Sequence, residues 1–130
     1  AKLREEVMSM RHKMHSGHPN NSELFDLKHD SGGIVDVEFI VQYLVLAHAA
    51  QYPQLTQNLG NIALLEMLGE LGLMEKVKAH EVADAYREYR RLQHSIRLQG
   101  ESKARVALAE VAPAVAAVQG LWNQIFHVTG

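Results

Sequence analysis

Apolar side chains recur every three or four residues along most of the chain, which is the spacing of an amphipathic α-helix. Stretches rich in Gly, Pro, Asn and Ser separate these helical segments. A weak alternation from Leu24 to Lys28 favours a short extended strip, and no run is typical of a sheet. The sequence therefore predicts an all-α bundle of about five helices. The first predicted helix ends near residue 15, and the other four cover about 34–50, 61–71, 79–98 and 103–128.

The helix predicted over 34–50 is apolar around nearly its whole circumference, which favours a position in the middle of the bundle. Asp30 or Ser31 can cap its start. Gly72 is expected to end the third helix, because glycine is the usual residue just past a helix end. Pro113 is expected to kink or restart the last helix, because proline lacks the backbone donor that a helix interior needs.

The composition is that of a globular domain. The chain has 130 residues, 47% of them hydrophobic, which fits one domain over 1–130. A net charge of −2 gives no field that would attract nucleic acid or an anionic membrane, and no apolar run has the length of a membrane span. The lack of cysteine excludes disulfides and thiolate chemistry and fits a cytoplasmic location. The chain begins inside a helical pattern without an initiator Met, so we interpret it as part of a longer protein.

The segment from Lys28 to Glu38 is the strongest candidate for a functional site. Gly32 and Gly33 join a polar loop to the apolar helix, and glycines at a helix start let an anion approach free backbone amides. Lys28 adds a positive charge for a phosphate or carboxylate. Asp36 and Glu38 are two positions apart, so they point to nearly opposite sides of a helix and cannot form a paired carboxylate site. The residues alone also allow a structural interpretation, in which a tight turn brings the acids to nearby donors.

A second candidate is the basic face of the helix predicted over 79–98, on the side away from its apolar stripe. Its arginines and histidine, three and four positions apart, could bind an anion or an acidic partner helix. The alternative is a solvated face with internal ion pairs, because acids lie three positions before two of the arginines. Arg90 and His94 have no acid three or four positions before them, so they are the better candidates for a site.

A metal site is not expected in this chain. His12, His15 and His18 are spaced by three, but a metal site normally needs three or four oriented ligands, and His18 falls beyond Gly17, where the helix fails. The chain also lacks a P-loop, a dinucleotide-binding glycine pattern and a nucleophile elbow. Nucleotidyl transfer through metal ions needs clustered carboxylates, which the sequence does not supply. We therefore expect no catalytic residue and no metal ligand here.

Three segments resemble the glutamine synthetase adenylyltransferases, which are bifunctional adenylylating and adenylyl-removing enzymes. Residues 25–42 resemble the Asp-Leu-Lys, Gly-Gly, Asp-x-Glu-Phe and Val-Gln motif of that family. Residues 10–13 (Met-Arg-His-Lys) resemble its Met-Arg-x-Lys, and residues 89–98 resemble its later Arg-Arg-Leu-x-His segment. The first motif is the specific one, because it combines many residue types in a fixed order.

The resemblance implies a place in a larger enzyme. Such enzymes hold two nucleotidyltransferase domains, each followed by a helical domain. One half attaches AMP from ATP to a tyrosine of glutamine synthetase with Mg²⁺, the other removes it by phosphorolysis, and the PII signalling protein and glutamine regulate both. The last apolar stretch, near Trp122 and Gly130, looks like a protein terminus, so we expect the helical domain after the second, adenylylating domain. The metal-binding Gly-Ser and Asp-x-Asp motifs of the family are absent here, so this chain alone should be inactive and hold no cofactor.

The motif match also implies which residues face the upstream nucleotidyltransferase domain, as nucleotide-binding or domain-interface residues. These candidates are Lys28, Gly32, Gly33, Asp36, Glu38, Arg90 and His94. Two other functions compete with this one. The chain could be a non-catalytic interaction module that binds PII or glutamine synthetase, or it could be the related helical domain of the PII uridylyltransferase.

Overall fold

A computed structural model describes residues 2–17, 20, 22–57, 59–101 and 104–126. Within these residues the chain forms five α-helices, one short 3-10 helix and a two-stranded sheet, so the expected all-α bundle is confirmed. None of these helices is both long enough and apolar enough to cross a membrane. The elements are α1 (Lys2–Gly17), β1 (Phe25–Asp26), α2 (Ile34–His48), η1 (Pro53–Thr56), α3 (Asn61–Glu70), α4 (Lys76–Leu98), β2 (Arg105–Val106) and α5 (Leu108–Phe126).

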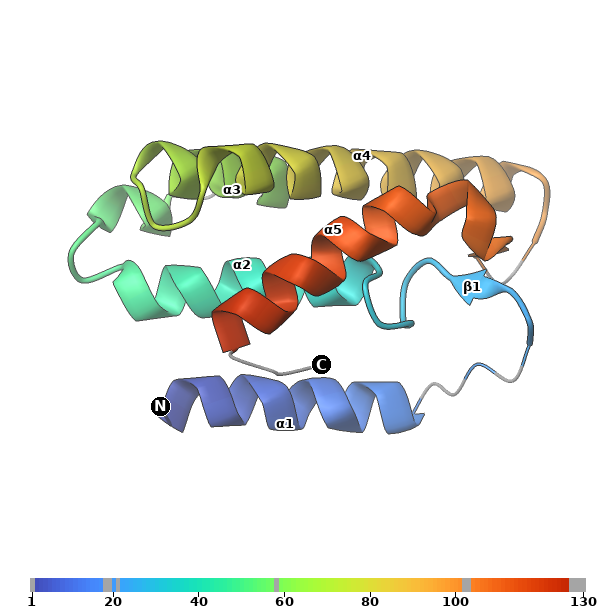
Figure 1. Cartoon of the computed structure of the whole chain (residues 1–130), viewed down its shortest axis with the longest axis horizontal. Helices are drawn as coiled ribbons and strands as arrows, with labels where there is room; N and C mark the ends of the chain where they lie inside the picture. Colours follow the sequence, from blue (N-terminus) through green and yellow to red (C-terminus); the bar gives the residue numbers. More distant parts are fainter. Residues whose placement is uncertain (1, 18–19, 21, 58, 102–103, 127–130) are drawn as a thin grey trace.

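Helix α2 lies in the middle of the bundle, as its apolar sequence predicts. Figure 1 shows α1 on one side of α2 and the α3–α4 pair on the other, with α5 running obliquely across. Eight of the fifteen residues of α2 are buried, including Asp36. On α4 the predicted apolar stripe also faces inward: Val82, Tyr86 and Tyr89 are buried there. Helix α1 is more loosely attached, because Val7 is the one buried residue among those described in it.

The short sheet is the main departure from the predicted secondary structure. Phe25 pairs with Val106 and Asp26 with Arg105 in antiparallel register, so the extended strip predicted over 24–28 is confirmed at Phe25 and Asp26 only. The prediction that a helix begins near residue 103 was wrong: residue 103 lies outside the described part, Arg105 and Val106 are in β2, and α5 starts at Leu108. The pairing comes from a strand about 80 positions earlier, which local propensity does not reveal.

Some of the predicted helix boundaries were correct and others were wrong. Gly72 adopts a positive φ of +75° just past α3, while Leu73 donates its N–H to the carbonyl of Leu68, so this stop is confirmed. Helix α4 begins at Lys76 instead of residue 79. Helix α5 continues through Pro113, which therefore does not restart it. The predicted end of this helix at residue 128 lies outside the described residues.

The predicted cap of α2 was also wrong. The residue at the cap position is Gly33, and it makes no side-chain capping bond. Instead, Asp36 in the first turn reaches back and accepts the N–H of Gly32 at 2.7 Å. This resembles the acidic half of a capping box, in which a carboxylate three positions into the helix satisfies a donor at its start. The cap is therefore supplied from inside the helix.

Candidate functional site

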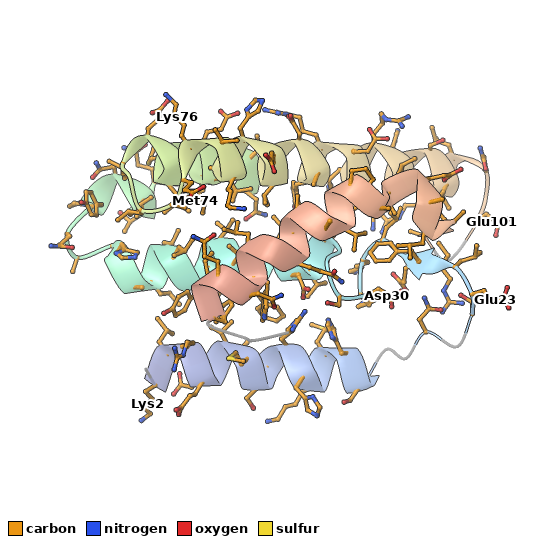
Figure 2. The ribbon with its side chains drawn as sticks, viewed as in Figure 1. Lys2, Glu23, Asp30, Met74, Lys76 and Glu101 are labelled. Carbon is orange, nitrogen blue, oxygen red and sulfur yellow. The ribbon has the colours of Figure 1, made fainter. Side chains whose placement is uncertain are left out.

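The diglycine loop, which we define as residues 27–33 between β1 and α2, is held by its own backbone and by two aspartates. Asp26 Oδ1 accepts the N–H groups of Lys28 and His29 at 2.9 and 3.0 Å. Asp30 Oδ2 accepts the N–H of Asp26 at 2.9 Å and the Asn20 side-chain amide at 2.8 Å. Figure 2 shows Asp30 in this loop, at the end of the bundle that holds β1. Aspartates commonly order turns in this way.

Both glycines are needed because neighbouring atoms leave no room for a side chain. Gly32 has a φ of +89°, and a Cβ there would lie 2.9 Å from Val115 Cγ1. A Cβ on Gly33 would lie 2.5 Å from the carbonyl oxygen of Leu27. Both positions are buried. The glycines therefore let other parts of the same chain pack closely against the loop. This close packing alone explains why both positions are glycine.

The backbone amides at the start of α2 are already bonded within the chain. Gly32 donates to Asp36, Gly33 to the carbonyl of Asp30, and Ile34 to that of Leu27, at 2.7, 2.9 and 2.7 Å. Val35 donates to the carbonyl of Lys28 at 3.0 Å. An anion at a helix start needs free donors. These four amides offer none, so the loop as it stands does not fit a nucleotide phosphate.

Asp36 is the centre of a buried ion pair. Its side chain is 0% exposed, and Arg11 of α1 binds both carboxylate oxygens, with Nε to Oδ1 at 2.9 Å and Nη2 to Oδ2 at 2.7 Å. Together with the Gly32 N–H, these donors compensate the buried charge. The Nε2 atom of His15 lies 3.5 Å from Oδ1. Asp36 therefore connects α1, α2 and the diglycine loop.

Arg11 is the residue that reasoning from the sequence missed as part of this site. Its guanidinium lies 3.9 Å from the centre of the Trp122 ring of α5, and its Nη2 donates to Ser31 Oγ at 3.0 Å. Arg11 thus contacts three different parts of the molecule besides its own helix. The available signal was its place in the Met-Arg-x-Lys segment, although no local pattern identifies Asp36 as its partner.

Tyr89 of α4 secures the other side of the diglycine loop. Its hydroxyl donates to the carbonyl of Gly32 at 2.7 Å. Burial raises the pKa of this hydroxyl, and the negative charge of Asp36 raises it further. Tyr89 therefore remains a hydrogen-bond donor throughout the neutral range. Both backbone groups of Gly32 are therefore hydrogen-bonded, its N–H to Asp36 and its carbonyl to Tyr89.

The two acids of the motif diverge, as their spacing predicts. Asp36 turns toward α1, whereas Glu38 Oε2 accepts a bond from the hydroxyl of Tyr86 on α4 at 3.3 Å. The same hydroxyl accepts the side-chain amide of Asn61 at 3.2 Å. No group of three or more metal-ligating side chains comes together in the described part of the chain. Because Arg11 occupies Asp36 and Glu38 points elsewhere, these acids do not fit a Mg²⁺ site.

The remaining candidates are on the surface. Lys28 is exposed on the diglycine loop, and Arg90 and His94 are exposed on α4. No hydrogen bond or ion pair between described residues joins Arg90 or His94 to the diglycine loop; Tyr89 makes that connection instead.

The internal ion pairs expected on this face of α4 are confirmed. Arg87 donates to Asp84, and Arg91 donates to Glu88, each across three positions of the helix. Arg87 also reaches Glu66 of α3 at 3.1 Å. Much of the basic face is therefore neutralised by neighbouring acids. Arg90 and His94 stay predicted interface residues.

Fold and site together define a helical domain whose motif is organised around a buried ion pair. A family model described as GlnD PII-uridylyltransferase matches residues 1–125, so the chain belongs to that family. It is 52% identical to the bifunctional glutamine synthetase adenylyltransferase/adenylyl-removing enzyme of Burkholderia mallei, over 97% of this chain and 14% of that protein. The enzymes of the same name from Bordetella bronchiseptica and Aromatoleum aromaticum are 55% and 56% identical, over 96% and 97% of this chain and 13% of each enzyme.

The comparisons confirm the resemblance that the motifs indicated. They also extend it, because the matches cover 95–97% of the chain and not only the three segments at residues 10–13, 25–42 and 89–98. The chain spans about one seventh of the length of the curated relatives it matches.

Proposed function

We propose that this chain is the helical domain that follows the adenylylating nucleotidyltransferase domain of a cytoplasmic glutamine synthetase adenylyltransferase. The catalytic domain transfers AMP from ATP, with Mg²⁺, to a tyrosine of glutamine synthetase, and PII regulates the enzyme. The observation that carries the proposal is the identity of 52–56% to enzymes of that name over nearly the whole chain. It agrees with the motif in residues 25–42.

The role of this domain is to position parts of the enzyme and not to catalyse. Its acids do not fit Mg²⁺, and its loop amides do not fit a phosphate, so both ligands belong to the catalytic domain. The Arg11–Asp36 pair and Tyr89 hold the diglycine loop in one conformation. That conformation leaves Lys28 exposed, where its charge can meet the neighbouring domain or a nucleotide held there. Without the bonds from Asp36 and Tyr89, the loop would adopt several conformations, and the position of the Lys28 charge would vary.

The test uses the longer protein that includes the nucleotidyltransferase domain. AMP transfer to glutamine synthetase is measured for the unsubstituted protein, for Lys28→Ala and for Lys76→Ala as a matched control. Lys76 is also exposed, but it lies at the start of α4, at the opposite end of the bundle from Asp30 (Figure 2). We expect Lys28→Ala to lower transfer about tenfold, the effect of one lost charge-assisted contact, and Lys76→Ala to leave it unchanged.

The kinetic constants then separate two roles of Lys28. A raised KM for ATP indicates a contact with nucleotide, whereas a lowered kcat at constant KM indicates alignment of the two domains. Unchanged AMP transfer by the Lys28→Ala variant would show that Lys28 has no role in the reaction. A longer protein that transfers no AMP to glutamine synthetase would refute the proposed function itself.

One observation favours a second function. Because the four amides from Gly32 to Val35 are bonded inside the chain, a domain that binds only protein partners would need no change in this loop. Such a module would bind PII or glutamine synthetase without nucleotide. Calorimetry of the chain against PII and against glutamine synthetase discriminates the two: heat with either protein favours the module, whereas no heat with both favours a domain that acts only together with the catalytic domain. The family description also makes uridylyl transfer to PII the alternative activity for the longer protein.

A further inference from the structure

A groove of about 440 Å³ lies between α2 and α3, on the side of α2 that carries Glu38. One end of it is polar, with Glu38, Gln42 and Asn61, and its other lining residues are apolar. The lining residues are Glu38, Val41, Gln42, Val45, Leu46, Asn61 and Leu64. None of them is basic. A groove with apolar walls and a single carboxylate has the chemistry of a site for an apolar ligand that carries one positive charge.

The groove residues of α2 follow the pattern of a helix-docking seam. Glu38, Gln42, Val45 and Leu46 recur at four- and three-residue spacing, which places them along one stripe of the helix. Leu46 is 56% exposed although it belongs to the central and most apolar helix of the bundle. A stripe of this kind on a central helix is what a further helix would cover.

The carboxylate of Glu38 is oriented but its charge is not neutralised. The hydroxyl of Tyr86 donates to it at 3.3 Å, and Asn61 donates to that hydroxyl in turn. Both donors are neutral, and no Lys, Arg or His among the described residues forms an ion pair with Glu38. A half-buried carboxylate held by neutral groups strongly favours a cation as its next partner. Charge complementarity therefore specifies what should cover this end of the groove.

We propose that the groove binds an amphipathic helix that carries an arginine or lysine to pair with Glu38 and apolar side chains to cover Val45 and Leu46. Glu38 and Leu46 are eight positions apart, which is about 12 Å along a helix. The docked helix should therefore place its basic residue about seven or eight positions from the apolar residue that contacts Leu46. The occupant belongs to the remainder of the same polypeptide, since the relatives are about seven times as long as this chain; this assignment rests on the proposed function.

Photo-cross-linking in the longer protein tests the proposal. A benzoylphenylalanine at position 46 is irradiated, and the linked peptide is identified by mass spectrometry. We expect a link within one polypeptide to a segment with the basic and apolar spacing given above. Glu38→Gln, which keeps the shape and an acceptor oxygen but removes the charge, should lower the yield roughly fivefold, which is less than the loss of a whole charge-assisted contact. Glu81→Gln, an exposed acid outside the groove, is the matched control and should leave the yield unchanged.

Several results would overturn the proposal. The proposal fails if no cross-link forms, if the linked segment has no basic residue, or if the cross-link yield is unchanged by Glu38→Gln. It also fails if a mixture of isotope-labelled and unlabelled protein shows that the link joins two copies. A charge swap gives a second check: Glu38→Lys should abolish the link, and reversing the mapped basic residue to Glu should restore it. AMP transfer by the unsubstituted longer protein is measured separately. Failure of that transfer counts against the proposed function, whereas failure of the link with normal transfer counts against the groove alone.

Discussion

Replacing Arg11 by methionine should cost more stability than any substitution on the surface of the domain. The change keeps a long apolar side chain but leaves the Asp36 carboxylate, which is 0% exposed, with the Gly32 N–H as its main donor. Breaking a buried ion pair by removing one partner typically costs about 3–5 kcal/mol. Loss of the contact with the Trp122 ring adds up to about 1 kcal/mol. We therefore expect Arg11→Met to lower the free energy of unfolding by at least about 3 kcal/mol.

Urea unfolding followed by two probes measures this loss. Circular dichroism reports the helices, and fluorescence reports Trp122, the sole tryptophan, which is 1% exposed beneath Arg11. Coincident curves establish a two-state transition, from which the free energy follows by linear extrapolation. The matched control is Arg91→Met, which breaks an exposed ion pair with Glu88 and should leave the midpoint unchanged.

A double-mutant cycle isolates the buried charge as the cause. Asp36→Asn removes the charge while keeping the shape of the side chain. In the Arg11→Met background it should therefore recover about 1–3 kcal/mol, because no unpaired charge is then buried. A loss below about 1 kcal/mol for Arg11→Met, or single effects that simply add, would mean that the pair behaves as an exposed one and would refute the reasoning.

Two further predictions concern the diglycine loop. Gly33→Ala should lower the free energy of unfolding by about 1–3 kcal/mol, because its Cβ would lie 2.5 Å from the Leu27 carbonyl oxygen. Gly120→Ala is the control: it has open space around it in α5 and should raise the free energy of unfolding by up to about 1 kcal/mol. Equal melting temperatures for the two variants would contradict this. The raised pKa of Tyr89 should make stability complete below about pH 10 and make it fall at higher pH, where the unfolded chain ionises this hydroxyl and the folded chain does not. Urea midpoints between about pH 9 and 11 should fall less steeply for Tyr89→Phe; identical slopes would exclude a buried, neutral Tyr89.

Periodicity predicts the helices well because each buries a stripe against its neighbours. It placed the start of α2 at Ile34 and the inward face of α4 correctly. It failed at Arg105–Val106, where pairing with β1 decides the conformation. At Pro113 the expected alternative of a new helix start does not occur, because α5 continues through it. In both places a long-range contact or the continuation of a packed helix overrides a local preference.

The site shows the same limit more sharply. The motif and the divergence of Asp36 from Glu38 are visible in the sequence, because they depend on positions within one helix. The partner of Asp36 is not visible, because Arg11 lies 25 positions away on a different helix. Nor does the sequence show that the backbone amides of Gly32 to Val35 are occupied, since the acceptors are the Asp36 carboxylate and backbone carbonyls of the same loop. A glycine pair before a helix is equally compatible with an anion site and with close packing.

The motif consists of two sets of residues with separate physical roles. Gly32, Gly33 and Asp36 are buried, and packing and hydrogen bonds within this chain explain them. Lys28 and Glu38 reach the surface. The bond that Glu38 accepts comes from the neutral Tyr86 hydroxyl, so the folding of this chain requires neither the charge of Lys28 nor that of Glu38. Substitutions in the first set should therefore lower stability and activity together. Lys28→Ala, and Glu38→Gln with its acceptor oxygen kept, should lower activity in the longer protein at unchanged stability, and a measured loss of stability for Lys28→Ala would show that the two sets are not separate.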